Sequence, residues 1–118
     1  MLPRELHYLK DMLNAVKLAQ DFVAGIDWET FEHDLMRQSA VIRQFEIVGE
    51  AARRISSQTQ ANIPDIPWSK VIGMRNHLIY EYDDLNLEII WDTIHLALPE
   101  LITKLENIIT AQESENSK

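Results

Sequence analysis

The sequence predicts an all-α protein, folded as an antiparallel bundle of about five helices. Apolar residues recur every three or four positions, as they do on the buried face of a helix. The strict alternation of apolar and polar residues that marks a half-buried strand is missing. Only three glycines occur in the 118 residues, so long segments are free of helix-breaking positions. Short polar connections between such helices favour antiparallel neighbours.

The first two helices are predicted from their ends. Proline is tolerated in a first helical turn, and the apolar repeat that follows predicts a helix from Pro3 to about Ala24. Gly25 is a suitable stop, since glycine adopts the left-handed conformation found at helix ends. Asp27 is a good N-cap, so we expect a short second helix from Trp28 to about Leu35.

A third helix is expected from about Arg37 to Gln58. Its apolar stripe consists of Val41, Phe45, Val48, Ala52 and Ile55. Gly49 interrupts this stripe at a cost of about 1 kcal/mol relative to alanine, which indicates close contact with another helix. The segment Pro64–Pro67 contains two prolines and is a firm break.

The last two helices follow this break. A fourth helix should run from about Trp68 to Tyr80, and Asn86 is a good cap for the fifth. Pro99 falls inside the fifth helix and should kink it, because proline has no N–H to donate. We expect one domain over residues 1–111 and a polar, frayed tail over residues 112–118. The inward positions of these helices are Val71, Met74 and Leu78 in the fourth, and Ile90, Trp91, Ile94, Leu98, Leu101, Leu105 and Ile108 in the fifth.

Composition narrows the class of protein. The absence of cysteine excludes disulfides and thiolate metal sites and suits a reducing cytoplasm. His7, His33 and His95 are scattered, without a second histidine at helical spacing, so no metal site is expected. We see no apolar leader and no membrane span, which predicts a cytoplasmic protein without membrane contact.

The net charge of −8 argues against nucleic acid, but the charges are unevenly placed. Between Arg37 and Arg75 there are six basic and three acidic residues, an excess that a local phosphate site would show. Uneven surface charge on ordinary helices explains the composition equally simply, and composition alone favours that interpretation.

The stretch from Gly73 to Tyr82 is the most informative. On an ideal helix Arg75 and Tyr82 are seven residues apart and share a face, and His77 and Tyr80 are neighbours on another. An ordinary helix end with a histidine favoured by the helix dipole has the same residue types. The residue types alone favour that structural interpretation over a catalytic one.

Four ordered blocks resemble the HepT-like HEPN ribonuclease toxins of HEPN/MNT (type VII) toxin–antitoxin systems. Residues 41–52, VIRQFEIVGEAA, resemble the long-helix signature of that family, and residues 63–68, IPDIPW, resemble its interhelical turn. Residues 75–82, RNHLIYEY, occupy its Arg-x4-His-x-Tyr motif, and residues 87–94, LEIIWDTI, resemble the next helix. The resemblance covers nearly the whole chain.

The resemblance implies a homodimer of the HEPN fold whose two motifs line a shared cleft. It also implies metal-independent, cofactor-free cleavage of RNA, with transfer RNA as a candidate target. Arg75 and Arg43 would bind RNA, and Asn76 and His77 would belong to the catalytic set. An arginine fork suits phosphate, and a histidine suits proton transfer near neutral pH. The implied partner is a cognate MNT nucleotidyltransferase antitoxin, which transfers AMP to the motif tyrosine, Tyr82.

This sequence departs from the family motif at one position, where Tyr80 replaces the histidine. A free tyrosine has a pKa of about 10 and exchanges protons poorly at neutral pH. The chain is an inactive variant, natural or engineered; or His77, one turn back, substitutes; or Tyr80 serves in a modified site. We favour impaired chemistry in this form. The alternative function is a catalytically inactive dimer that binds RNA or nucleotide and its partner.

Overall fold

The computed structural model describes residues 1–80 and 85–116, and this part of the chain is helical without a strand. The all-α prediction is confirmed. Residues 87–116 form one nearly continuous helix that contains a π-helical segment, η2. The elements are α1 (Pro3–Val23), α2 (Trp28–Glu32), α3 (Leu35–Arg53), α4 (Ser57–Asn62), α5 (Trp68–Tyr80), α6 (Leu87–Asp92), η2 (Thr93–Ala97) and α7 (Leu98–Asn116).

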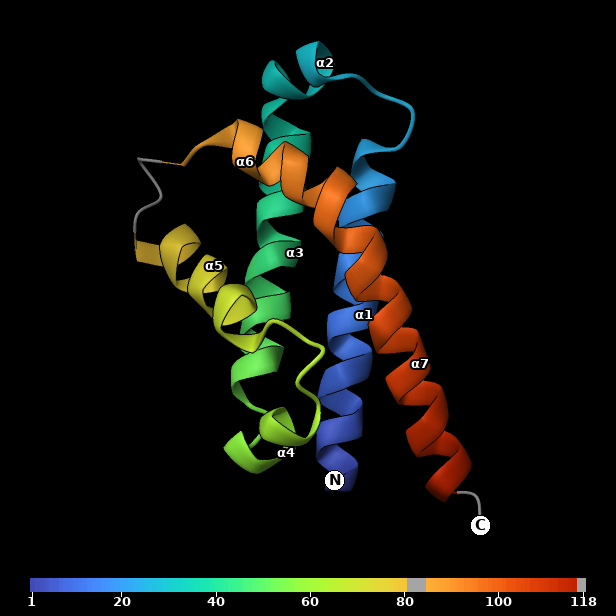
Figure 1. The fold of residues 1–118 in the computed structure, drawn as a ribbon. Helices are drawn as coiled ribbons and strands as arrows, with labels where there is room; N and C mark the ends of the chain where they lie inside the picture. Colours follow the sequence, from blue (N-terminus) through green and yellow to red (C-terminus); the bar gives the residue numbers. More distant parts are fainter. Residues whose placement is uncertain (81–84, 117–118) are drawn as a thin grey trace.

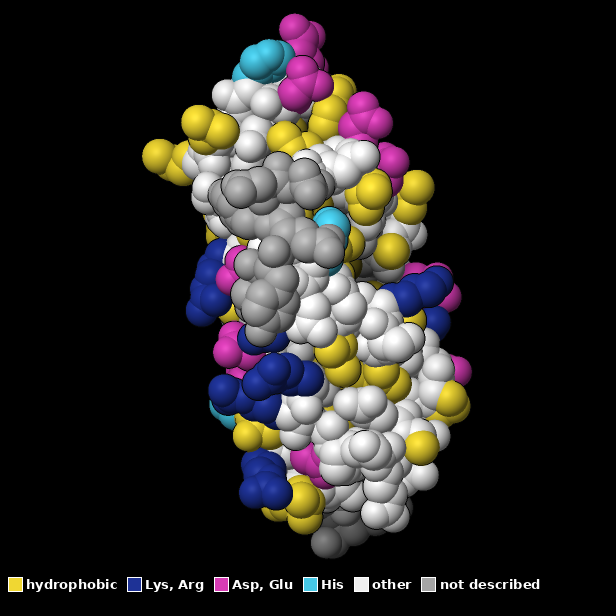
Figure 2. All heavy atoms as spheres, turned by 90° about the vertical axis from the view of Figure 1, so that its left-hand side faces the viewer, with side chains coloured by type: hydrophobic (Ala, Val, Ile, Leu, Met, Phe, Trp, Pro, Cys, Tyr) yellow, Lys and Arg dark blue, Asp and Glu magenta, His cyan; other side chains and the backbone are white. Residues whose placement is uncertain are grey.

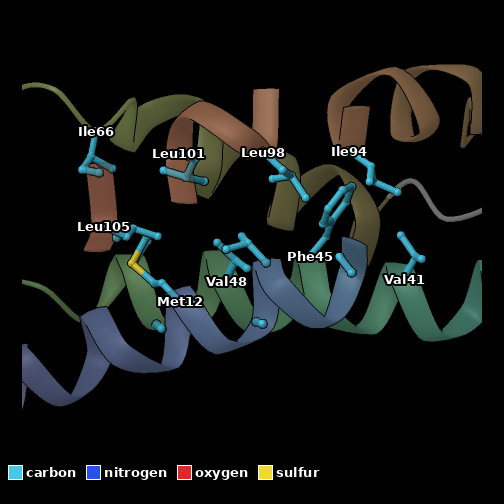
Figure 3. Close-up of a cluster of buried hydrophobic side chains, with 14 of the residues drawn as sticks. Met12, Val41, Phe45, Val48, Ile66, Ile94, Leu98, Leu101 and Leu105 are labelled. Atoms are coloured by element: carbon cyan, nitrogen blue, oxygen red, sulfur yellow. The ribbon is translucent and has the colours of Figure 1, made fainter. Parts of the chain in front are cut away.

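The three-helix centre of the fold is α1, α3 and α7, with α5 on the outer side of α3 (Figure 1). Helix α3 packs against both α1 and α5, and α1 also packs against α7. Helices α3 and α7 run antiparallel to α1 (Figure 1). The core between these helices is apolar (Figure 3), and its side chains include Met12, Val41, Phe45, Val48, Ile66, Ile94, Leu98, Leu101 and Leu105.

Local capping sets the ends of the first helices. Gly25 has a φ of 77° and ends α1, as predicted. The Asp27 carboxylate accepts a hydrogen bond from the Thr30 N–H at 2.9 Å, which confirms it as the cap of α2. The predicted end of α2 was wrong, because α2 stops at Glu32. Asp34 accepts from the Arg37 N–H at 3.0 Å and starts α3 earlier than expected.

The predicted end of the third helix was also wrong. Helix α3 ends at Arg53, and residues up to Gln58 do not continue it. Ser56 instead caps a short additional helix, α4, by accepting a hydrogen bond from the Thr59 N–H at 3.2 Å. Serine competes with the helical backbone for hydrogen bonds, which is why it starts a new helix here.

Glu5 explains why the chain breaks at this point. Its side chain is only 2% exposed and belongs to α1. The carboxylate accepts hydrogen bonds from the Ser56 N–H at 2.8 Å and from the Thr59 hydroxyl at 3.0 Å. Burial raises the pKa of Glu5, but these bonds and that from the Leu2 N–H outweigh it and lower the pKa from 4.5 to about 2. A buried charge from α1 thus holds the start of α4.

The break before α5 is tied down by Trp68. Its indole N–H donates to the Ile63 carbonyl at 2.9 Å across the proline-containing turn. Helix α5 then begins at Trp68 and ends at Tyr80, as predicted. The predicted inward residue Leu78 is 1% exposed, and Val71 and Met74 pack partly buried against the core.

Pro99 distorts the last helix as expected. Asn86 caps α6 by accepting from the Glu88 and Ile89 N–H groups at 2.9 and 3.3 Å. The π-helical segment η2 lies directly before the proline-containing turn, and the helix changes direction there (Figure 1). Because proline lacks an N–H and crowds the carbonyl four residues earlier, the backbone widens locally. Helix α7 continues to Asn116.

Candidate functional site

The motif helix α5 touches α3 at Gly49. This glycine is buried, and a methyl group added there would overlap the Cβ of Arg75 and lie 2.8 Å from its Cγ. The same methyl group would lie 3.1 Å from the Val71 carbonyl oxygen. The close helix contact predicted for Gly49 is confirmed. The contact presses the stem of Arg75 against α3.

The guanidinium of Arg75 is held on one side. Its Nη1 donates to the Asn76 Oδ1 at 2.9 Å. Its Nε is buried and has no hydrogen-bond partner among the residues that the structure describes. An unpaired buried N–H typically costs about 1–3 kcal/mol, so such a group favours an added acceptor nearby. Arg75 is therefore a positioned cation whose guanidinium is only partly hydrogen-bonded by the described residues.

The structure describes some of the remaining motif residues and leaves others out. His77 is half-buried and makes an interaction of its own. Tyr80 is the last residue of α5, and its side chain lies outside the described part of the chain. Tyr82 lies outside the described residues. The predicted sharing of one face by Arg75 and Tyr82 therefore stays a prediction.

Arg43 belongs to a different surface from Arg75. It is exposed and pairs with Glu46, with 3.4 Å between Nη1 and Oε2. It lines a hollow of about 230 Å³ between α1 and α3. On α3, Arg43 lies roughly 120° around the helix from Gly49, against which Arg75 packs. The structure does not bring the two arginines of the sequence-based site together in one pocket.

A second hollow, of about 260 Å³, is apolar and lies between α3, α5 and the η2–α7 segment. Met74, which precedes Arg75, lines it together with Val48 and Leu98. Seen from the side of α5, hydrophobic side chains appear within the middle of the face, while Lys and Arg side chains gather mainly along one border (Figure 2). The lining of the hollow is mostly apolar and includes one basic residue, Lys70.

Comparison with known proteins settles the family. A family model described as "Ribonuclease HepT-like" matches residues 12–108. The chain belongs to the HepT-like ribonuclease family. The match begins in α1 and ends in α7, so it includes the Gly49–Arg75 contact.

Curated relatives of this HepT-like chain carry matching names. A Thermococcus cleftensis protein named "Probable ribonuclease HepT" is 36% identical over 101 residues, covering 86% of this chain and 92% of its own. A Methanocaldococcus jannaschii protein named as a "Putative RNase" is 34% identical over 109 residues, covering 92% and 90%. Another of that description, from Caldanaerobacter subterraneus subsp. tengcongensis, is 33% identical over 106 residues, covering 90% and 95%. No solved structure matches the chain.

Within the described residues, no helix is long and apolar enough to cross a membrane. The same residues contain no group of three or more His, Asp or Glu side chains that could hold a metal ion.

Proposed function

We propose that this chain is the toxin of a toxin–antitoxin pair, an endoribonuclease that binds the RNA backbone through Arg75. The observation that carries the proposal is the position of Arg75: its stem packs against Gly49, its Nη1 bonds to Asn76, and its Nε has no hydrogen-bond partner among the described residues. A guanidinium keeps its charge at any physiological pH and presents a fork of N–H donors that matches phosphate oxygens. Membership of the HepT-like ribonuclease family supports RNA as the source of that phosphate.

The reaction requires no metal ion. The 2′-hydroxyl of the RNA loses its proton and its oxygen bonds to the adjacent phosphorus. The bond from phosphorus to the 5′-oxygen breaks, and that oxygen takes up a proton. The pentavalent phosphorane between these steps carries extra negative charge, which Arg75 stabilises. Proton transfer to and from the two oxygens is the part that a motif histidine would catalyse.

Tyr80 impairs this proton transfer. A phenol with a pKa of about 10 is a poor base at neutral pH, whereas imidazole titrates near 6.5. His77, three residues earlier on the same helix, is the other candidate for this role.

The proposed composite site belongs to a homodimer, so light scattering should give about twice the chain mass of 13.7 kDa. A clean monomer at micromolar concentration would remove the shared cleft.

The proposed antidote is AMP transfer to Tyr82 by an MNT nucleotidyltransferase. Each transfer forms a phosphodiester on the tyrosine oxygen and releases pyrophosphate from ATP. Each transferred group adds one negative charge and the bulk of adenosine close to Arg75 in sequence. RNA phosphate would then meet repulsion and a steric block.

A second function is favoured by one observation, the tyrosine at position 80. A dimer without its proton-transfer group would still bind RNA or nucleotide and its partner. Such a protein would act as a binding module, with Arg75 and Asn76 in the same roles.

The deciding experiment compares RNA cleavage by this chain and by Tyr80→His. General acid–base catalysis is typically worth about 10²–10⁴-fold, so we expect a gain of that size and a matching gain in cellular toxicity. The chain with Tyr80 could instead cut RNA well and lose this activity on His77→Ala. That result would overturn the role given to position 80. If both forms bind RNA and neither cuts it, the proposed ribonuclease function is wrong and the binding-module function takes its place.

A further inference from the structure

The hollow between α1 and α3 is lined mainly by polar and charged side chains. It is lined by Tyr8 and Asp11 from α1 and by Arg43 and Glu50 from α3, with Arg54 just beyond the end of α3. It lies on the opposite side of α3 from the core residues Phe45 and Val48, since the two sets are roughly 150° apart around the helix. None of the described motif residues of α5 lines it.

Two charged groups in this hollow, Glu50 and Arg54, have no ion-pair partner among the described residues. Glu50 and Arg54 are four residues apart in the order that favours an ion pair on a helix. In the part of the chain that the structure describes, they form none. The guanidinium carbon of Arg54 instead lies 6.0 Å from the centre of the Tyr8 ring. An exposed arginine at this distance is loosely held and free to turn toward an anion.

We propose that this hollow binds an unpaired guanine nucleotide of the RNA substrate, at a second contact separate from the α5 motif. The inference rests on the proposed function, whose substrate it specifies. The base stacks on the half-buried Tyr8 ring once Arg54 turns away to the nucleotide phosphate. Arg43, exposed on the same rim, adds positive charge for the neighbouring phosphate. Stacking on an aromatic side chain is how single-stranded RNA is commonly held.

Glu50 determines which base is preferred. A carboxylate only accepts hydrogen bonds, and it can accept two in parallel. The Watson–Crick edge of guanine carries two adjacent donors, N1–H and the N2 amino group, which match such a carboxylate. Adenine presents the unprotonated N1 acceptor on this edge, which a carboxylate repels. Guanine is therefore the base that the hollow suits.

One exposed arginine of α3 lies between the hollow and the motif. On α3, Arg53 lies roughly 40° around the helix from Gly49, between the Arg75 contact and the hollow. Arg53 is exposed and, in the described part of the chain, forms no ion pair. Lys and Arg side chains gather along one border of the face seen from α5 (Figure 2). In a chain of net charge −8, exposed arginines such as Arg53 favour contact with an RNA backbone.

The test measures binding of a fluorescent, uridine-rich single strand that contains one guanine, beside the same strand with adenine there. We expect the guanine strand to bind about tenfold more tightly, and Glu50→Gln to remove most of this preference, since an amide can pair with either base. Tyr8→Leu and Arg54→Gln should each weaken binding about tenfold. Arg4→Gln, an exposed arginine at the start of α1, is the control and should change little.

The outcomes separate this inference from the proposed function. Unchanged binding by the Arg54→Gln and Glu50→Gln variants, with a loss on Arg75→Ala, overturns the hollow and leaves the motif. If the hollow variants lose RNA binding and Arg75→Ala does not, the contact in the hollow is supported and the RNA-binding role of Arg75 is overturned. Arg54 is exposed, so its variant tests the idea even if Tyr8→Leu unfolds. Saturation by free GMP without binding of either strand would assign the hollow to a free nucleotide and overturn the RNA contact.

Discussion

Gly49 on α3 lies directly against the side chain of Arg75 on α5, with no room for a methyl group between them. The packing of the two helices and the position of the arginine that we propose to bind phosphate therefore depend on the same contact. A change at a residue that carries no functional group should alter both stability and RNA binding.

Gly49→Ala tests this coupling. The added methyl group must push α5 away, and overpacking of this kind costs about 1–3 kcal/mol. Better helix propensity returns up to about 1 kcal/mol, so the net effect should be a loss of stability and weaker RNA binding. The matched control is Gly73→Ala in α5, where a Cβ meets nothing within 4 Å. That variant should be about 0.5–1 kcal/mol more stable in urea unfolding. Equal effects of the two changes would contradict the close contact.

Glu5 predicts how stability depends on pH. Its pKa is about 2 in the folded protein and 4.5 otherwise, so the folded state favours the ionised form. The contribution, about 3 kcal/mol, is complete above pH 4.5 and is lost as the pH falls toward 2. Glu5→Gln should therefore be less stable at pH 7, with a difference that shrinks as the pH falls. Urea unfolding across this range measures it, with the exposed Glu115→Gln as control. A constant difference at all pH values would contradict the assignment.

Arg75→Ala should weaken RNA binding more than Arg4→Ala does. Arg75 is held by the contact with Gly49 and the bond to Asn76, whereas Arg4 is exposed at the start of α1. Losing one phosphate contact should also make the log–log salt dependence of binding shallower by about one unit. Binding titrations at several salt concentrations check both effects. Equal losses from the two variants would mean diffuse attraction without a defined site.

Tyr82 is the predicted acceptor of AMP. Intact mass after incubation with the nucleotidyltransferase partner and ATP should rise in steps of one AMP, and Tyr82→Phe should abolish the rise. The chain has only two other tyrosines, Tyr8 and Tyr80, so the comparison is clean. A rise that persists in the variant would move the modification to one of them and shift the register of the motif.

The helices and several of their ends were predictable from the sequence because their causes are local. The apolar repeat, Gly25, and the caps Asp27 and Asn86 act within one helical turn, and the structure has them as expected. The glycine in the third helix correctly indicated a close contact. Arg75, Asn76, His77 and Tyr80 lie on α5, where the predicted helix has them, and the shared face of Arg75 and Tyr82 stays a prediction.

The features that only the tertiary structure decided depend on contacts between residues far apart in the chain. The break between α3 and α4 depends on Glu5, whose carboxylate lies some fifty positions earlier and bonds to Ser56. Arg43 and Arg75 looked alike as basic residues, yet packing set them on different sides of α3. Nothing in the sequence marks Tyr8 as a candidate functional residue. It becomes one only in the folded chain, where the guanidinium of Arg54 lies near its ring. Burial and contact between distant segments carry free energies that no local pattern encodes, so only the folded chain fixes these relationships.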